Sequence, residues 1–94
     1  MVKIVWEVEK NRVAAYDEKT CIGKCEYIVK DSIWQLVHTE VDPAYGGQGI
    51  ARKLVAQVVQ EARNKGVKID PICSYAQKEF QRNPDYQDVD INFL

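Results

Sequence analysis

The fold is decided by residues 38–66, which read HTEVDPAYGGQGIARKLVAQVVQEARNKG. The stretch begins with strand-forming residues and breaks at Asp42-Pro43, where proline fixes its own φ and disfavours helix in the residue before it. Three glycines follow within residues 46–49, and glycine lets the backbone bend tightly and approach a ligand closely. The order predicts a strand, a glycine loop and a helix.

The helix is predicted from about Gly49 to Lys65, and Gly66 is a typical residue to end it. Apolar residues recur every three or four positions, so they form one stripe that packs on a sheet. These residues are Ile50, Ala51, Leu54, Val55, Val58, Val59 and Ala62.

A glycine loop that leads into a helix is suited to bind an anion. The first N–H groups of a helix have no partner inside it, and the helix dipole favours negative charge there. The loop lacks the Lys-Ser/Thr of a P-loop, and Gly46-Gly47-Gln48-Gly49 is not the GxGxxG of dinucleotide-binding folds. The alternative is a tight turn without a ligand; three glycines in four residues favour a ligand such as a diphosphate.

Residues 46–51, GGQGIA, resemble the acetyl-CoA motif of GNAT N-acetyltransferases, written Q/R-x-x-G-x-G/A. Gly49 and Ala51 match its last two fixed positions. Gly46 stands where the motif has Gln or Arg, which removes one polar side chain from the site. Together with HTEV at 38–41 and PICSY at 71–75, the chain resembles the small YjdJ-type GNAT-like proteins from about residue 11 to residue 86.

This resemblance implies an α/β fold with a mostly antiparallel mixed sheet, one splayed parallel strand pair and a long helix after the glycine loop. It also implies acetyl-CoA (CoA) as cofactor, without a metal. The residues implied in binding it are Val41, Gly46, Gly47, Gln48, Gly49, Ile50, Ala51 and Arg52.

Alternating apolar residues predict the strands of the sheet. The strands are expected at 2–8, 12–16, 20–29, 33–41 and 67–73. The last strand should run parallel to the strand before the helix, because a helix crossover joins them. Pro71 cannot donate a ladder hydrogen bond, and the splayed pair of the GNAT fold accommodates it. A second helix is expected from Tyr75 to Arg82; whether the tail to Leu94 docks is left open.

Strict alternation also predicts which side chains share a face of the sheet. In the strand 33–41 it places Trp34, Leu36, His38 and Glu40 together. In the strand 20–29 it places Cys21 on one face with Cys25, and Ile22 on the other. Gly23 in that strand suggests a bulge or a close approach of backbones.

Acetyl transfer from a thioester needs a neutral amine, a partner for the oxyanion and a proton for the leaving thiolate. The resemblance places the thioester between the splayed strands, with Cys73 on one arm and His38 on the other. A Cys–His pair can give an activated thiolate. An inert core cysteine and a hydrogen-bonded strand histidine are the alternatives.

Two further side chains have catalytic counterparts in GNAT enzymes. Glu40 corresponds to a glutamate that often serves as base near this place, and a solvated edge carboxylate is the alternative. Tyr75 corresponds to the tyrosine that often protonates the leaving thiolate, although its spacing from Cys73 is shorter than usual.

Composition limits the class of protein. A chain of 94 residues with 46% hydrophobic content makes one domain, 1–94, with a modest core. A net charge of −1 argues against a nucleic-acid surface. With neither a membrane-length apolar run nor a visible signal peptide, we expect no membrane partner and a cytoplasmic location.

The three cysteines are expected to be reduced thiols. Cys21 and Cys25 lie about 13 Å apart along one strand, which is too far for a disulfide. No pair has zinc-ligand spacing with a histidine, so no metal site is expected.

The function expected from these observations is a minimal acetyl-CoA-dependent N-acetyltransferase. GNAT enzymes usually place two helices between their first two strands, and here only a few polar residues separate Tyr16 from Thr20. The acceptor side should therefore be open, which suits an exposed amine on a protein or peptide. One alternative is a CoA/acyl-CoA-binding module with little or no transferase activity. Another is a small interaction domain whose loop binds no nucleotide.

Overall fold

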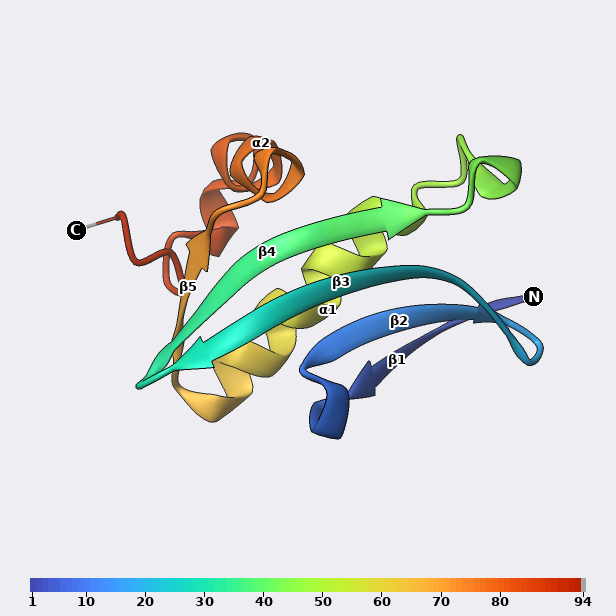
Figure 1. The fold of residues 1–94 in the computed structure, drawn as a ribbon. Coiled ribbons are helices and arrows are strands. Elements are labelled where there is room, and N and C mark those ends of the chain that lie inside the picture. Colours follow the sequence, from blue (N-terminus) through green and yellow to red (C-terminus); the bar gives the residue numbers. More distant parts are fainter. Residues whose placement is uncertain (94) are drawn as a thin grey trace.

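Five strands form one sheet in sequence order in the computed structural model, which describes residues 1–93. The strands are β1 (Val2–Glu7), β2 (Arg12–Asp17), β3 (Thr20–Lys30), β4 (Ile33–Val41) and β5 (Lys68–Pro71). Strands β1 to β4 pair antiparallel, and β5 pairs parallel with β4 (Figure 1). The predicted fold class is confirmed, with a final strand shorter than expected.

Helix α1 (Ile50–Lys65) lies across one face of the sheet, behind it in Figure 1. All of its predicted apolar stripe is buried except Ala51, which is half-buried. The stripe packs against side chains such as Val13, Tyr27 and Leu36, and this layer is the core. Gly66 ends the helix in the left-handed conformation, with φ of 72°, and donates its N–H to Ala62.

The parallel pair is splayed, as the resemblance implied. β4 and β5 pair only from Ile33 beside Lys68 to Leu36 beside Pro71. The Leu36 carbonyl then accepts from two successive amides, those of residues 72 and 73, at 3.0 and 2.9 Å. β4 continues to Val41, while the other arm turns away into helix α2 (Ser74–Arg82), so the two arms diverge in Figure 1. Pro71 stands where the ladder ends, so its missing N–H costs no hydrogen bond there.

A bulge in β4 changes which residues face the core. Glu26 pairs with His38 but the next residue, Tyr27, pairs with Leu36, so Val37 is an extra residue in β4. Trp34 and Leu36 are buried, whereas His38 and Glu40 are exposed on the opposite face. The prediction that these four share a face is therefore wrong, because the alternation changes phase at Val37.

A second bulge lies in β3. Ala15 pairs with Gly23 and Tyr16 with Cys21, which leaves Ile22 as the extra residue. Ile22 is buried and Cys21 is exposed, so the predicted faces of these two are also wrong.

The close approach expected at Gly23 is confirmed. A Cβ there would lie 3.1 Å from the Glu40 carbonyl oxygen and 3.2 Å from Val41 Cγ2. The absent side chain therefore lets β3 and the end of β4 pass closely beside the bulge.

The chain after α2 docks on the outer edge of β5, which answers the open question for residues up to 93. Ile69 donates its N–H to the Val89 carbonyl at 2.6 Å, and Ile91 donates to Ile69 at 2.9 Å. Val89 is buried in the core cluster. Within residues 1–93 no helix has the length and apolar character needed to cross a membrane.

Candidate active site at the splayed strands

A hollow of about 230 Å³ opens at the start of α1. It is lined by every residue expected to bind the cofactor except Gln48, and also by Tyr45 and Tyr75. The end of β4, the glycine loop, the first turn of α1 and the start of α2 therefore meet around one space.

The backbone of the loop fits a ligand that approaches closely. Gly47 and Gly49 are left-handed, with φ of 79° and 71°. A Cβ built at either position would have no heavy atom within 4 Å, so the space beside each glycine is open. No side chain in residues 1–93 caps the N-terminus of α1, which leaves its first N–H groups for a ligand. This arrangement suits a diphosphate.

Two contacts hold the loop in place. Asp42 caps the short 3-10 helix η2 (Pro43–Tyr45) by accepting from the Ala44 N–H at 2.9 Å. The Tyr45 hydroxyl donates to the Asp17 carboxylate on β2, and this bond lowers the pKa of Asp17 and raises that of Tyr45. No role was predicted for Tyr45 from the sequence. The feature that could have indicated one is that Tyr45 is a single aromatic residue in a glycine-rich turn.

Cys73 lies at the N-cap of α2 and is half-buried. Its Sγ accepts from the Ala76 N–H at 3.4 Å and lies 3.6 Å from Thr39 Oγ1. Thr39 is on the core-facing side of β4, where it also lies 3.4 Å from the Sγ of the buried Cys25. Thr39, rather than His38, is thus the β4 residue that contacts Cys73.

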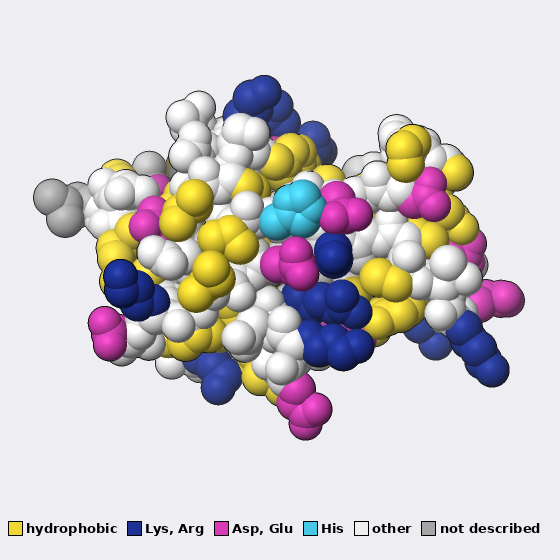
Figure 2. Space-filling view, viewed as in Figure 1, with side chains coloured by type: hydrophobic (Ala, Val, Ile, Leu, Met, Phe, Trp, Pro, Cys, Tyr) yellow, Lys and Arg dark blue, Asp and Glu magenta, His cyan; other side chains and the backbone are white. Residues whose placement is uncertain are grey.

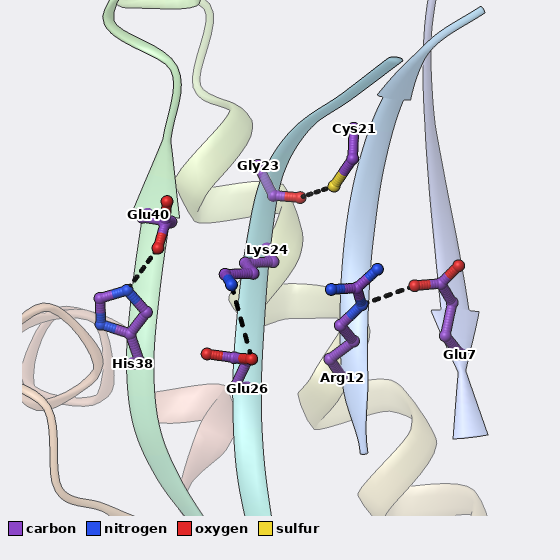
Figure 3. Close-up of polar contacts among 8 residues, drawn as sticks. All are labelled: Glu7, Arg12, Cys21, Gly23, Lys24, Glu26, His38 and Glu40. Atoms are coloured by element: carbon purple, nitrogen blue, oxygen red, sulfur yellow. Dashed lines mark hydrogen bonds and ion pairs between the residues drawn. The ribbon is translucent and has the colours of Figure 1, made fainter. Parts of the chain in front are cut away.

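His38 and Glu40 lie together on the other face of the sheet (Figure 3). His38 Nε2 is 2.6 Å from Glu40 Oε1, and the two side chains are 51% and 57% exposed. This hydrogen bond lowers the pKa of Glu40, which makes its carboxylate a weaker base. The structure therefore does not bring His38 to Cys73.

The face that carries His38 has mixed charge (Figure 2). Arg12 Nε lies 2.6 Å from Glu7 Oε1, and Lys24 Nζ lies 3.7 Å from Glu26 Oε2. A hollow of about 400 Å³ is lined there by residues that include Arg12, Lys24 and Glu40. Neither positive nor negative side chains dominate the lining of this hollow. Among the residues that the structure describes, no group of side chains is arranged to bind a metal ion.

Tyr75 is the one predicted catalytic residue that lines the cofactor hollow. Burial is the main cause that raises the pKa of its hydroxyl, followed by the charge of Glu79. The hydroxyl is therefore protonated at neutral pH and has a proton to give.

Glu79 is a site residue that the sequence analysis missed. Its side chain is 1% exposed, and its Oε2 accepts from Arg82 at 3.1 Å. Its Oε1 lies 3.8 Å from Arg52 Nε and has no hydrogen-bond partner within residues 1–93. Burying a carboxylate is costly unless it is paired. The sequence feature that could have indicated burial is the position of Glu79 in α2. It comes three residues after Ala76 and next to Phe80, so it lies on the apolar side of the helix.

Comparison with known proteins identifies the class. Residues 12–89 match the family described as GCN5-related N-acetyl-transferase. The chain belongs to this family, whose chemistry is acetyl transfer, and the resemblance stated above is confirmed.

Two kinds of relative are similar in sequence. Protein NATD1 of Homo sapiens and of Mus musculus is 39% identical over 59 residues, which are 63% of this chain. The matched residues cover 51% of the length of the human protein and 53% of the length of the mouse protein. The chain therefore spans about half the length of the curated relatives it matches. A GCN5-like candidate N-acetyltransferase from Staphylococcus aureus, solved by NMR, is 30% identical. It has a TM-score of 0.76 over 98% of this chain and 90% of that one.

More distant structures share the fold. The ribosomal-protein-S18-alanine N-acetyltransferase of Escherichia coli is 20% identical, with a TM-score of 0.63 over 76% of this chain and 49% of that one. The PaiA N-acetyltransferase of Thermoplasma acidophilum, solved in complex with coenzyme A, is 21% identical. Its TM-score is 0.55, over 60% of this chain and 35% of that one.

Proposed function

We propose that this protein is an acetyl-CoA-dependent N-acetyltransferase that acts on an exposed amine of a protein or peptide. The observation that carries the proposal is the hollow at the start of α1. There the residues of the acetyl-CoA motif and Tyr75 surround one space, beside the splayed ends of β4 and β5. Coenzyme A in the Thermoplasma acidophilum neighbour supports the same cofactor here.

The loop supplies the binding groups. The left-handed Gly47 and Gly49 and the uncapped first turn of α1 would hold the diphosphate through backbone N–H groups. Arg52 lines the same hollow and would add a positive charge. When bound, acetyl-CoA would supply an activated acetyl thioester.

Cys73 and Tyr75 are the side chains that would act on the reacting atoms. Cys73 Sγ accepts a hydrogen bond from the Ala76 N–H at the start of α2. The N-terminus of a helix favours negative charge on such a sulfur. We propose that Cys73, after losing its thiol proton to solvent, would form a bond to the acetyl carbon as the thioester bond to CoA breaks, and that Tyr75 would protonate the leaving sulfur. The amine would then take the acetyl group from Cys73 and release a proton to solvent, which would restore the Cys73 thiolate and, through solvent, the Tyr75 proton. In the direct alternative, the amine attacks the thioester itself, and Cys73 forms no bond to the acetyl group.

His38 and Glu40 have a different role in this proposal. They lie on the exposed face, where Glu40 would orient the His38 ring and His38 would take the proton from an incoming amine. The hollow of about 400 Å³ beside Glu40 is lined by both charge signs and would receive the side chain that carries the amine.

A CoA- or acyl-CoA-binding module with little transferase activity is the second candidate. Gly46 favours it, because the motif's Gln or Arg is absent and one polar contact to the cofactor is missing.

One experiment separates the two candidates. Calorimetry with acetyl-CoA, mapped by NMR on the backbone amides, should give saturable binding with the largest shifts in residues 46–52. Incubation with acetyl-CoA and a lysine peptide should then give acetylated peptide faster than thioester hydrolysis. Binding without peptide acetylation would favour the module, and an absence of binding would refute both candidates.

The role of Cys73 is decided by intact-protein mass spectrometry after incubation with acetyl-CoA alone. If Cys73 takes the acetyl, the protein gains the mass of one acetyl group. The Cys73→Ala variant should lose both the adduct and turnover. A Cys73→Ala variant that keeps most activity would favour direct attack by the amine.

A further inference from the structure

Thr39 lies between two thiols in the splayed region. Its Oγ1 is 3.4 Å from Cys25 Sγ on β3 and 3.6 Å from Cys73 Sγ at the start of α2. The bulge at Val37 creates this arrangement, because it turns Thr39 toward the core-facing side of β4. A threonine at this place thus connects a buried thiol to a half-buried one.

The direction of these hydrogen bonds follows from Cys25. Burial raises the pKa of the Cys25 thiol to about 12, so this thiol keeps its proton. Thr39 Oγ1 is the one polar partner of that sulfur within residues 1–93. We take Cys25 as the donor in this bond, because its buried S–H would otherwise have no polar partner among the described residues. A hydroxyl has a single proton to donate, and the Thr39 proton is left for Cys73 Sγ.

We propose that Thr39 is a positioning residue for acetyl transfer: it donates a hydrogen bond to Cys73 Sγ, and Cys25 sets the direction of that bond. The sulfur then receives two donors, the Thr39 hydroxyl and the Ala76 N–H. Both bonds strengthen when the sulfur carries negative charge. The link to acetyl transfer rests on the proposed function, whereas the hydrogen bond to Cys73 does not.

The test measures how fast iodoacetamide alkylates Cys73 as a function of pH, by intact mass. It uses a Cys21→Ser background, because Cys21 is exposed and would react as well. Thr39→Val has nearly the same shape but has no hydroxyl. It should move the midpoint of the pH profile upward by about one to two pH units. Thr39→Ser, which keeps the hydroxyl, should restore the original midpoint.

Controls separate this role from a loss of folding. Thermal unfolding of each variant shows that it is folded, and Thr39→Ala replaces Thr39→Val if that variant unfolds. Cys25→Ala should shift the midpoint upward by less, because the hydroxyl remains but is free to rotate; Cys25→Ser should have no effect.

Two outcomes would overturn the proposal: an unchanged midpoint in Thr39→Val, or the same shift in Thr39→Ser. In turnover, Thr39→Val should lower kcat and leave KM for acetyl-CoA unchanged. If the parent protein transfers no acetyl group, the proposed function fails, while the alkylation profiles still decide the role of Thr39.

Discussion

Two glycines at opposite ends of α1 allow a matched test of the cofactor site. Gly49 and Gly66 have φ of 71° and 72°, and a Cβ at either would have no heavy atom within 4 Å. Gly49 lines the hollow at the start of the helix, whereas Gly66 ends the helix. Gly49→Ala and Gly66→Ala therefore impose the same backbone strain at two sites, of which only one faces the proposed cofactor.

The cost in stability should be equal for the two variants. An alanine in the left-handed region loses about 1–2 kcal/mol relative to glycine. Neither new methyl group meets a neighbour, so we expect about 1 kcal/mol for each, which is a fall in Tm of about 4–8 °C for a chain of this size. Binding of CoA should differ, because a methyl group at Gly49 enters the space beside the first N–H groups of α1. We expect at least about tenfold weaker binding, or about 1.4 kcal/mol, for Gly49→Ala alone.

Calorimetric titration with CoA and thermal unfolding monitored by circular dichroism measure both quantities on the same samples. The larger side chain of Gly49→Val should abolish binding while the protein remains folded. If Gly49→Ala binds CoA as tightly as Gly66→Ala does, the cofactor does not lie against this loop, and the assignment of the hollow is refuted.

Three further changes have defined outcomes. Gly46→Arg should tighten CoA binding, measured by calorimetry, because it restores the motif's side chain; weaker binding would contradict this. Its Cβ would lie 3.2 Å from the Pro43 carbonyl oxygen, so the loop backbone must move slightly to accept it. Glu79→Met should leave Tm unchanged or raise it, because it removes a buried carboxylate, and should weaken CoA binding about two- to fivefold as Arg52 loses its ion pair. The pKa of the Cys25 thiol is about 12 in the folded chain against a reference value of 9.0, so the free energy of unfolding should fall between pH 9 and 12, by up to about 4 kcal/mol. Denaturant titrations at several pH values should show that Cys25→Ala loses less unfolding free energy than the parent protein between pH 9 and 12. If the two proteins lose the same amount, the raised pKa of Cys25 is refuted.

Local patterns in the sequence were sufficient for the main elements of the fold. The apolar period of α1 and the glycine at its end are local signals, and the structure follows them. Pro71 marked the point where the parallel pair separates, because a residue without an N–H is best placed where a ladder ends. The cofactor hollow follows from residues 38–66, since all of its lining residues except Tyr75 lie within that stretch.

The partners of Cys73 could not be predicted in this way. In residues 33–41 the even-numbered positions change from apolar at 34 and 36 to polar at 38 and 40. Polar residues are also common near the end of a strand, so this change alone does not identify an extra residue at Val37. The bulge depends on the register between β3 and β4, which only the assembled sheet determines. Glu79 was missed for a different reason. A carboxylate is rarely fully buried, and its arginine partner at position 52 comes from a different helix.

The bulge at Val37 also has a consequence for how β4 tolerates amino-acid changes. Before it, the even-numbered positions 34 and 36 are buried, so polar substitutions there should be poorly tolerated. After it, the odd-numbered positions 39 and 41 face inward, and the even-numbered positions should accept most residues as far as folding is concerned. A saturation scan of β4 should therefore show two intolerant series in opposite phase. Deleting Val37 should remove the bulge and leave one regular series, because Leu36, His38 and Thr39 can then keep both their partners on β3 and their faces. The extra residue thus moves the inward-facing positions of β4 from even to odd numbers without breaking its pairing with β3 on either side.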